Sequence, residues 1–286
     1  MIDVSSLGGL FAQDFMRNAF LAGIPIALLA GLVGYLLVLR TQVFTADALS
    51  HVAFTGALGA LALGHDPLLG LFVITIIGGF LLGILGPRGR ADDVVIGTVF
   101  SWVMGLGVLA LALYRAGPES SNNGSAGVTV LFGSIFSLDS LRAITAAAVA
   151  GVLVFVVLGI ARPLLFATVD PVVAAVRGVP VRLLGVGFLM LVAATTAEAT
   201  QAVGALLLLG LLAAPAGAAQ RLTARPYLAL GLSAGFSVLA MGLGLTVSYL
   251  LPRVPPSFAI VAIAAGTYLL ALAQRPGAGS AAPTAT

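Results

Sequence analysis

Residues 20–39 have the sequence FLAGIPIALLAGLVGYLLVL, which contains no charged side chain. About 20 apolar residues in a helix are enough to cross the hydrocarbon core of a bilayer. The same character extends over the whole chain of 286 residues, which is 60% hydrophobic and 8% charged, with a mean hydropathy of +1.16. A soluble domain carries about 25% charged residues, so this chain cannot cover a water-facing surface. The sequence therefore predicts an integral membrane protein.

Further uncharged stretches of similar length follow, and they predict an all-α polytopic fold. The stretch 183–220 is too long for one crossing, and its polar residues Thr195, Thr196, Glu198 and Gln201 predict a tight turn between two helices. With that turn, we expect eight or nine transmembrane helices in one domain over residues 1–275. The other predicted crossings are 48–64, 67–87, 94–114, 143–161, 227–251 and 256–273.

The arginines predict the orientation of these crossings, because basic loops stay cytoplasmic. With nine crossings, one side holds Arg40, Arg88, Arg90, Arg162, Arg177, Arg182, Arg221, Arg225 and Arg275. The other side holds only Arg17, Arg115, Arg142 and Arg253. We therefore expect an N-terminus outside the cell and a cytoplasmic C-terminus. The first residues lack a basic start followed by an apolar run, so they do not form a signal peptide.

Three segments are predicted to lie outside these crossings. Residues 128–138 are apolar but too short to span, which is typical of a re-entrant or interfacial piece. Residues 162–182 form the longest predicted cytoplasmic loop, and in it Asp170-Pro171 and Gly178 with Pro180 are start and stop signals for a short helix. An ordinary connector is the alternative for this loop. The Pro/Gly-rich tail 276–286 is predicted to be disordered.

The composition excludes several classes of chemistry. All 13 basic residues are arginines, so the lysine that a phosphate-binding loop requires is missing. The chain has no cysteine, which excludes disulfides and thiolate metal sites. Hydrolase motifs such as His-Glu-x-x-His and Gly-x-Ser-x-Gly are also missing. We therefore expect no enzyme activity, and any metal must be bound by oxygen or imidazole.

Asp47 and His51 are the leading candidates for a functional site, since a charge near the bilayer centre costs about 2.5–3.5 kcal/mol on insertion scales. Four residues apart on a helix, they point to the same side. Carboxylate with imidazole suits a divalent cation such as Zn²⁺ or Mn²⁺. Two ligands are too few for a stable site, and a twofold-related second copy would supply two more. Alternatively, Asp47 caps the second helix by accepting the N–H of Ser50, and His51 merely extends toward water.

Other ionisable residues are weaker candidates for a metal pathway. Glu198 lies among threonines, where it is either a turn residue exposed to water or a pathway residue. His65 and Asp66 precede Pro67 on the predicted outer side. They would either attract cations at the mouth of a pore or simply be solvated in a loop.

Several motifs, in the same order along the chain, resemble those of the metal-ion permease family of ABC importers, which take up zinc, manganese or iron. The stretch from Arg40 through Phe44-Thr-Ala-Asp-Ala-Leu-Ser-His51 to Gly56 resembles the family signature. It is followed by Asp93-Val-Val-Ile-Gly97, Leu131-Phe-Gly-Ser-Ile-Phe-Ser137, Asp170-Pro171 with Arg177-Gly-Val-Pro180, Gln201-Ala-Val-Gly-Ala-Leu-Leu207 and Ala214-Pro-Ala-Gly-Ala-Ala219. The family often has small residues and a proline soon after the histidine, where this chain has Phe54-Thr55-Gly56.

The resemblance implies a multi-pass permease of the bacterial inner membrane that works as a homodimer in contact with lipid and not with nucleic acid. Cytoplasmic ATP-binding subunits would power it, and an extracytoplasmic metal-binding protein would supply the ion. Asp47 and His51 would be the translocation ligands for transported Mn²⁺ or Zn²⁺, with no permanently bound cofactor. The loop containing Asp170, Pro171, Arg177 and Gly178 would couple the permease to the ATPase.

The ion and one rival function stay open at this point. The motif beginning at Gln201 favours the manganese type over the zinc type, and iron is not excluded. The main alternative is a stand-alone secondary transporter of divalent metal that uses the same ligands and a gradient. An intramembrane enzyme is the third class, for which the sequence offers no nucleophile.

Overall fold

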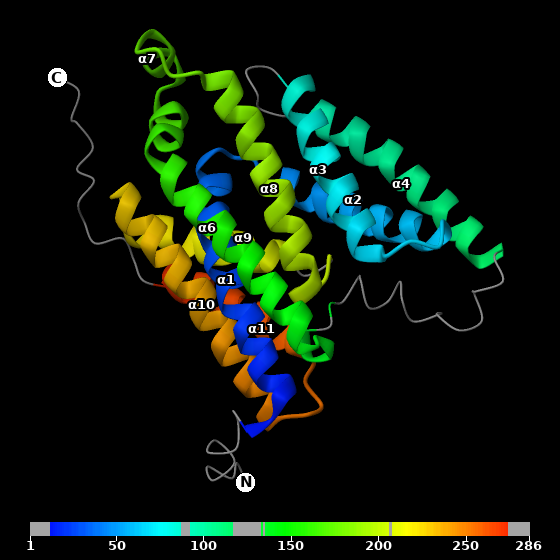
Figure 1. The fold of residues 1–286 in the computed structure, drawn as a ribbon. Coiled ribbons are helices and arrows are strands. Elements are labelled where there is room, and N and C mark those ends of the chain that lie inside the picture. The colour runs from blue at the N-terminus through cyan, green and yellow to red at the C-terminus, as the bar shows by residue number, and fades with distance from the viewer. Residues whose placement is uncertain (1–11, 87–91, 117–132, 134, 206–207, 274–286) are drawn as a thin grey trace.

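The structure is a computed structural model that describes residues 12–86, 92–116, 133, 135–205 and 208–273. In these ranges every regular element is helical (Figure 1). The elements are α1 (Asp14–Leu39), α2 (Val43–Ala62), α3 (Pro67–Leu85), α4 (Asp93–Ala116), the 3-10 turn η4 (Ile135–Ser137), α6 (Ser140–Val169), α7 (Pro171–Val176), α8 (Val181–Val203), α9 (Leu208–Leu222), α10 (Pro226–Leu250) and α11 (Pro256–Ala273).

Seven helices of the described chain are long and apolar enough to cross a membrane. These are α1, α3, α4, α6, α8, α10 and α11. Large apolar side chains such as Trp102 and Phe155 are exposed on the outer faces of the bundle, where lipid would cover them. The expectation of an all-α polytopic membrane protein is therefore confirmed. The other two long helices, α2 and α9, coincide with the remaining predicted crossings.

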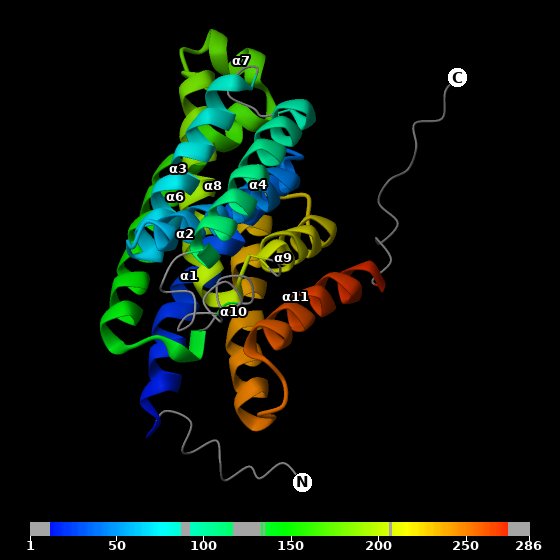
Figure 2. The ribbon, with the colours of Figure 1, turned by 90° about the vertical axis from the view of Figure 1, so that its right-hand side faces the viewer.

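Helices α1 and α8 form the centre of the bundle. In each, 72% of an apolar stretch of 18 residues is buried inside the bundle, compared with 17% for α4. Helix α1 packs against α6, α9 and α10, and α8 packs against α3, α2 and α1. In Figure 1, α8 lies between the group of α2, α3 and α4 and the group formed by the other long helices. Helix α7 lies at the end of the bundle opposite the start of α1 (Figures 1 and 2).

Local sequence signals explain where several helices begin. The carboxylate of Asp66 accepts a hydrogen bond from the N–H of Leu68, and that of Asp139 from the N–H of Arg142. An aspartate at this position satisfies an N–H that has no partner in the first turn. Proline is the first residue of α3, α7, α10 and α11, where its missing N–H costs nothing.

Glycine allows α1 to approach its neighbours closely. A methyl group added at Gly34 would collide with the backbone carbonyl of Leu212 in α9. One added at Gly31 would lie 2.6 Å from the Cα atom of Ala234 in α10. In lipid, helix association depends on this kind of close backbone packing, since there is no hydrophobic driving force between helices.

The predicted turn around Thr195–Gln201 is wrong. Helix α8 continues through Thr195, Thr196 and Glu198 to Val203. The helix ends at Gly204, which has φ of 84°. Threonine side chains stay compatible with the helix because Thr195 and Thr200 donate hydrogen bonds to the carbonyls four residues earlier. The break falls at glycine because it adopts this backbone conformation without steric cost.

Two other boundaries need correction or lie outside the described chain. The predicted loop 162–182 is helical at its start, because α6 continues past Arg162 and Pro163 to Val169. Of the predicted interfacial segment 128–138, residues 128–132 and 134 lie outside the described residues, and Ile135–Ser137 form one 3-10 turn. The predicted tail 276–286 also lies outside the described residues.

We expect Gly34→Ala to destabilise the bundle by about 1–3 kcal/mol, the usual cost of overpacking a close contact. Thermal denaturation of the detergent-solubilised protein would measure the effect. Gly151→Ala in α6 is the matched control, because an added methyl group there meets no atom within 4 Å. Equal melting temperatures for the two variants would contradict the close packing of α1 on α9.

Candidate metal centre

Asp47 and His51 lie on one face of α2. Both side chains are half-buried, and α2 places them one helical turn apart. Phe44 precedes them on the same face with 70% of its surface exposed, and Phe54 follows with partial exposure. This face of α2, defined by Phe44, Asp47, His51 and Phe54, is therefore left partly open in a single chain.

Asp47 does not cap the helix. Helix α2 begins at Val43 and its N-cap residue is Gln42, so Asp47 already belongs to the second turn. Ser50 does interact with Asp47, but its hydroxyl donates to the backbone carbonyl at 2.7 Å. The capping alternative is therefore wrong, and the carboxylate of Asp47 is not used to start the helix.

The imidazole of His51 is oriented by an aromatic contact with α4. Its ring centroid lies 5.3 Å from that of Phe100, with the planes inclined at 72° in an edge-to-face arrangement. Among the described residues, neither Asp47 nor His51 makes a side-chain hydrogen bond or an ion pair. Within the described part of the chain, no hydrogen bond or ion pair therefore occupies the carboxylate of Asp47 or the imidazole of His51.

One chain provides only part of a metal site. The described residues contain no group of three or more histidine, aspartate and glutamate side chains close enough to hold a metal ion. Zinc sites have at least three protein ligands, and Mn²⁺ is commonly bound by carboxylate, imidazole and water together. Further ligands must come from a second copy, from water or from both.

His65 and Asp66 lie at the far end of α2 from the pair. Fourteen residues separate His51 from His65, which is about 20 Å along a helix. Asp66 caps α3, and the Nδ1 atom of His65 lies 3.0 Å from the carbonyl oxygen of Leu63. Both side chains are exposed. The structure does not bring them together with Asp47 and His51.

Glu198 is buried in the bundle, not exposed in a turn. Only 1% of its surface is accessible, and Thr195, Thr196 and Thr200 around it are also buried. The adjacent Ala197 packs against Ala53 and Ala57 of α2. Glu198 therefore lies on a helix that contacts α2, but the structure does not join it with Asp47 and His51 into one ligand group.

The segment containing Asp170 forms the predicted short helix, α7. The Asp170 carboxylate accepts the N–H of Val173 at 2.9 Å, and Gly178 ends the segment with φ of 81°. The guanidinium of Arg177 lies 6.0 Å from the ring centroid of Phe166 in α6, which ties the end of α7 to the preceding helix. The start and stop signals in the sequence are thus confirmed.

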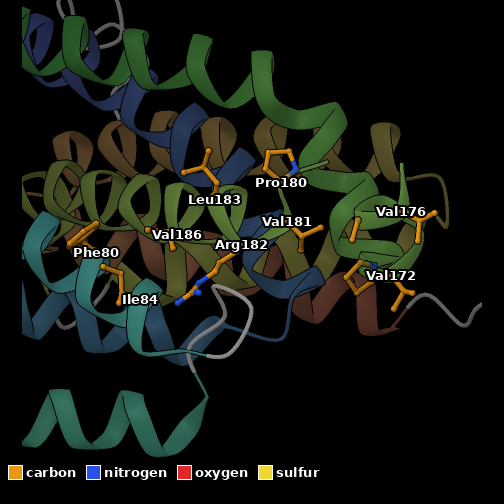
Figure 3. A pocket seen from close by; sticks show the side chains of 11 residues that line it. Phe80, Ile84, Val172, Val176, Pro180, Val181, Arg182, Leu183 and Val186 are labelled. Atoms are coloured by element: carbon orange, nitrogen blue, oxygen red, sulfur yellow. The ribbon is translucent and has the colours of Figure 1, made fainter. Parts of the chain in front are cut away.

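Helix α7 presents an apolar surface at the end of the bundle. Val176 is 84% exposed, and Val172 is exposed as well. Beside them is a cavity of about 1030 Å³ between α7, the beginning of α8 and the end of α3, which Figure 3 shows with Phe80, Ile84 and Val186 on its walls. Arg182 is the charged residue in this lining. An apolar end with a basic rim suits protein contact better than plain hydration.

Sequence reasoning missed the joint between α1 and α2. Thr41 has φ of 57°, and it is the non-glycine residue with positive φ in the described chain. Arg40 beside it is buried, with 5% of its surface accessible. A β-branched residue is unfavourable in this conformation, so the sequence contained no signal for it. Gly204 was also missed, although a glycine after a helical stretch is a stop signal.

The sequence is similar to a known protein family and to membrane proteins of metal transport systems. The model of the ABC 3 transport family matches residues 12–275. The manganese transport system membrane protein MntC of Halalkalibacterium halodurans is 26% identical over 274 residues, covering 94% of this chain and 90% of the relative. The chelated iron transport system membrane protein YfeD of Yersinia pestis is 30% identical over 206 residues, covering 72% and 67%.

A solved structure has the same fold. PsaBC from Streptococcus pneumoniae, in complex with a Fab, contains a chain that superposes with a TM-score of 0.80 and 24% sequence identity. The match covers 94% of both chains. At this identity the likeness establishes the fold.

Proposed function

The chain belongs to the ABC 3 transport family, and from this premise we propose that it is the membrane-spanning permease subunit of an ABC importer for manganese or a related divalent metal. It has no ATPase motif of its own, because the lysine of the phosphate-binding loop is missing. ATP hydrolysis therefore belongs to separate subunits, and this chain supplies the pathway through the membrane.

The proposal rests on the position of Asp47 and His51 and on the lack of side-chain hydrogen bonds to them among the described residues. In a bundle whose spans are almost free of charge, these two groups lie on one face, and neither makes a side-chain hydrogen bond or ion pair among the described residues. An ionisable residue in such surroundings is a functional candidate because its placement is costly. An acceptor pair that is available to a cation is what transient metal binding requires.

We propose that two copies of the chain complete the site. Among the described residues this face of α2 is only partly covered: His51 contacts Phe100 of α4, whereas Phe44 is 70% exposed. A twofold axis beside this face would bring two aspartates and two histidines together around one ion. Because C₂ interfaces place the same patch of each subunit opposite itself, one face of α2 is enough to build the site.

Manganese is the ion that the relatives favour. The MntC relative is named for manganese transport, whereas YfeD is named for chelated iron. Two carboxylates and two imidazoles with added water suit the larger coordination shell of Mn²⁺, and they would also accept Zn²⁺ or Fe²⁺. The ion is cargo: a site with few protein ligands and partial exposure can release it, unlike a closed structural cage.

We propose nine membrane crossings, with α2 and α9 added to the seven long apolar helices. The excess of arginine on one side supports a cytoplasmic position for α7 and an N-terminus outside the cell. The apolar face of α7 would then contact the ATP-binding subunit. The opposite end of the bundle would receive the ion from an extracytoplasmic binding protein.

Asp47→Ala and His51→Ala should each lower manganese uptake by at least about 100-fold, as loss of a ligand or its support commonly does. Uptake of radioactive Mn²⁺ by proteoliposomes that contain the complete transporter would measure this. Asp14→Ala is the matched control, since it replaces the same residue type as Asp47 at an exposed position. Normal uptake by both α2 variants would exclude the pair from the pathway.

Val176→Asp should abolish co-purification of the ATP-binding subunit, because it places a charge on the exposed apolar face of α7. The permease itself should remain in the membrane, since Val176 is not part of the core. Leu251→Asp is the control, because it replaces an exposed leucine that follows α10 and is not part of α7. Retained co-purification, or uptake by the purified permease without an ATPase, would contradict the proposal.

A further inference from the structure

The joint between α1 and α2 is a tightly closed turn around a strained residue. The N–H of Gln42 donates to the carbonyl of Leu37 at 3.0 Å, and the N–H of Thr41 donates to that of Val38 at 3.1 Å. This is the hydrogen-bond pattern of a Schellman motif, in which the residue in the left-handed conformation is usually glycine. Here that residue is Thr41, with φ of 57°.

Threonine in this position costs free energy, because its branched side chain crowds the backbone. Its hydroxyl donates to the carbonyl of Arg40 at 2.6 Å, which offsets part of the cost. A strained conformation persists only where surrounding contacts hold it. The contacts around Arg40 are therefore important for the geometry of the turn.

Arg40 supplies such contacts by bridging two other helices. Its Nε atom donates a hydrogen bond of 2.9 Å to the hydroxyl of Thr168 in α6. The centre of its guanidinium lies 4.5 Å from the ring centroid of Phe188 in α8. With 5% of its surface exposed, the charge is removed from water and depends on these partners.

Thr168 and Phe188 lie on either side of α7 in the chain. Thr168 is two residues before Asp170, the cap of α7, and Phe188 is in the second turn of α8, the helix that follows α7. On the other side, Asp47 follows Arg40 by seven residues and lies in the second turn of α2. The side chain of Arg40 thus connects the helices before and after α7 with the turn that precedes the proposed metal ligands.

We propose that Arg40 is the positioning residue that transmits movement of α7 to the α1–α2 joint and so to Asp47 and His51. The proposal rests on the proposed function, since α7 must be the element that the ATPase moves. The physical basis is the cost of leaving a buried charge without partners. When the ends of α6 and α8 shift, the guanidinium follows them, and the joint at Thr41 moves with it.

The geometry of the contact explains why arginine is required. A guanidinium is planar, so it can stack on Phe188 and donate in its own plane to Thr168 at the same time. Lysine keeps the charge but cannot hold both orientations. The role therefore predicts that Arg40→Lys resembles Arg40→Gln more than the unsubstituted protein.

The test is the number of Mn²⁺ ions moved per ATP hydrolysed by the complete transporter in proteoliposomes. Arg40→Gln should lower this ratio by about tenfold, the size of a typical coupling between sites, while ATP hydrolysis continues. Thr168→Val and Phe188→Leu remove one contact each and should lower the ratio in the same direction. The melting temperature should fall in these variants, because the buried charge loses contacts, but membrane insertion and ATP hydrolysis should persist. A merely structural role would lower uptake and hydrolysis together and leave their ratio unchanged.

Arg142→Gln is the matched control, an arginine exposed in an ion pair with Asp139, and it should leave the ratio unchanged. If Arg40→Gln fails to insert, the Thr168→Val and Phe188→Leu variants decide the question. Unchanged ratios in those two variants, or an equal fall in Arg142→Gln, would overturn the role of Arg40. Lack of ATP-dependent uptake by the unsubstituted complex would instead remove the proposed function itself.

Discussion

The cost of placing polar groups in a bilayer determines how this molecule is built. A chain that is 8% charged can leave its outer faces to lipid, and each ionisable group inside the spans must then be satisfied or used. Thr195 and Thr200 on α8 donate to carbonyls of their own helix, and Arg40 uses a hydroxyl and an aromatic ring. Asp47 and His51 differ, because their side chains make no hydrogen bond or ion pair among the described residues.

The helices around Asp47 and His51 connect these residues with the α7 segment. Helix α8 lies between the two helix groups and contacts both α1 and α2, while the α7 segment stands at its start. The turn between α1 and α2 is connected with the same segment, because Arg40 contacts Thr168 of α6 and Phe188 of α8. The proposed ion-binding face of α2 and the exposed face of α7 are thus linked through the contacts of Arg40 with Thr168 and Phe188.

The sequence was informative where a pattern is local and the physical rule is strong. Apolar stretches predicted the helices, the Asp170-Pro171 and Gly178 signals predicted α7, and four-residue spacing placed Asp47 and His51 on one face. It was misleading at Glu198, because a cluster of threonines with an acid is typical of a turn and can equally be a polar patch inside a buried helix. The contacts of Arg40 reach residues more than 100 positions away, which no local pattern reports. The positive φ of Thr41 falls on a residue type that disfavours it, so the sequence did not indicate it.

The central claim is that one cation is shared by two Asp47–His51 pairs from symmetry-related chains. Its most direct test is to count the Mn²⁺ ions bound by the purified permease dimer, using elemental analysis together with a measurement of protein mass. One ion for every two chains, lost when either chain of a mixed dimer carries both substitutions at Asp47 and His51, is the result that this account predicts. One ion per chain, or binding that survives in the mixed dimer, would contradict it.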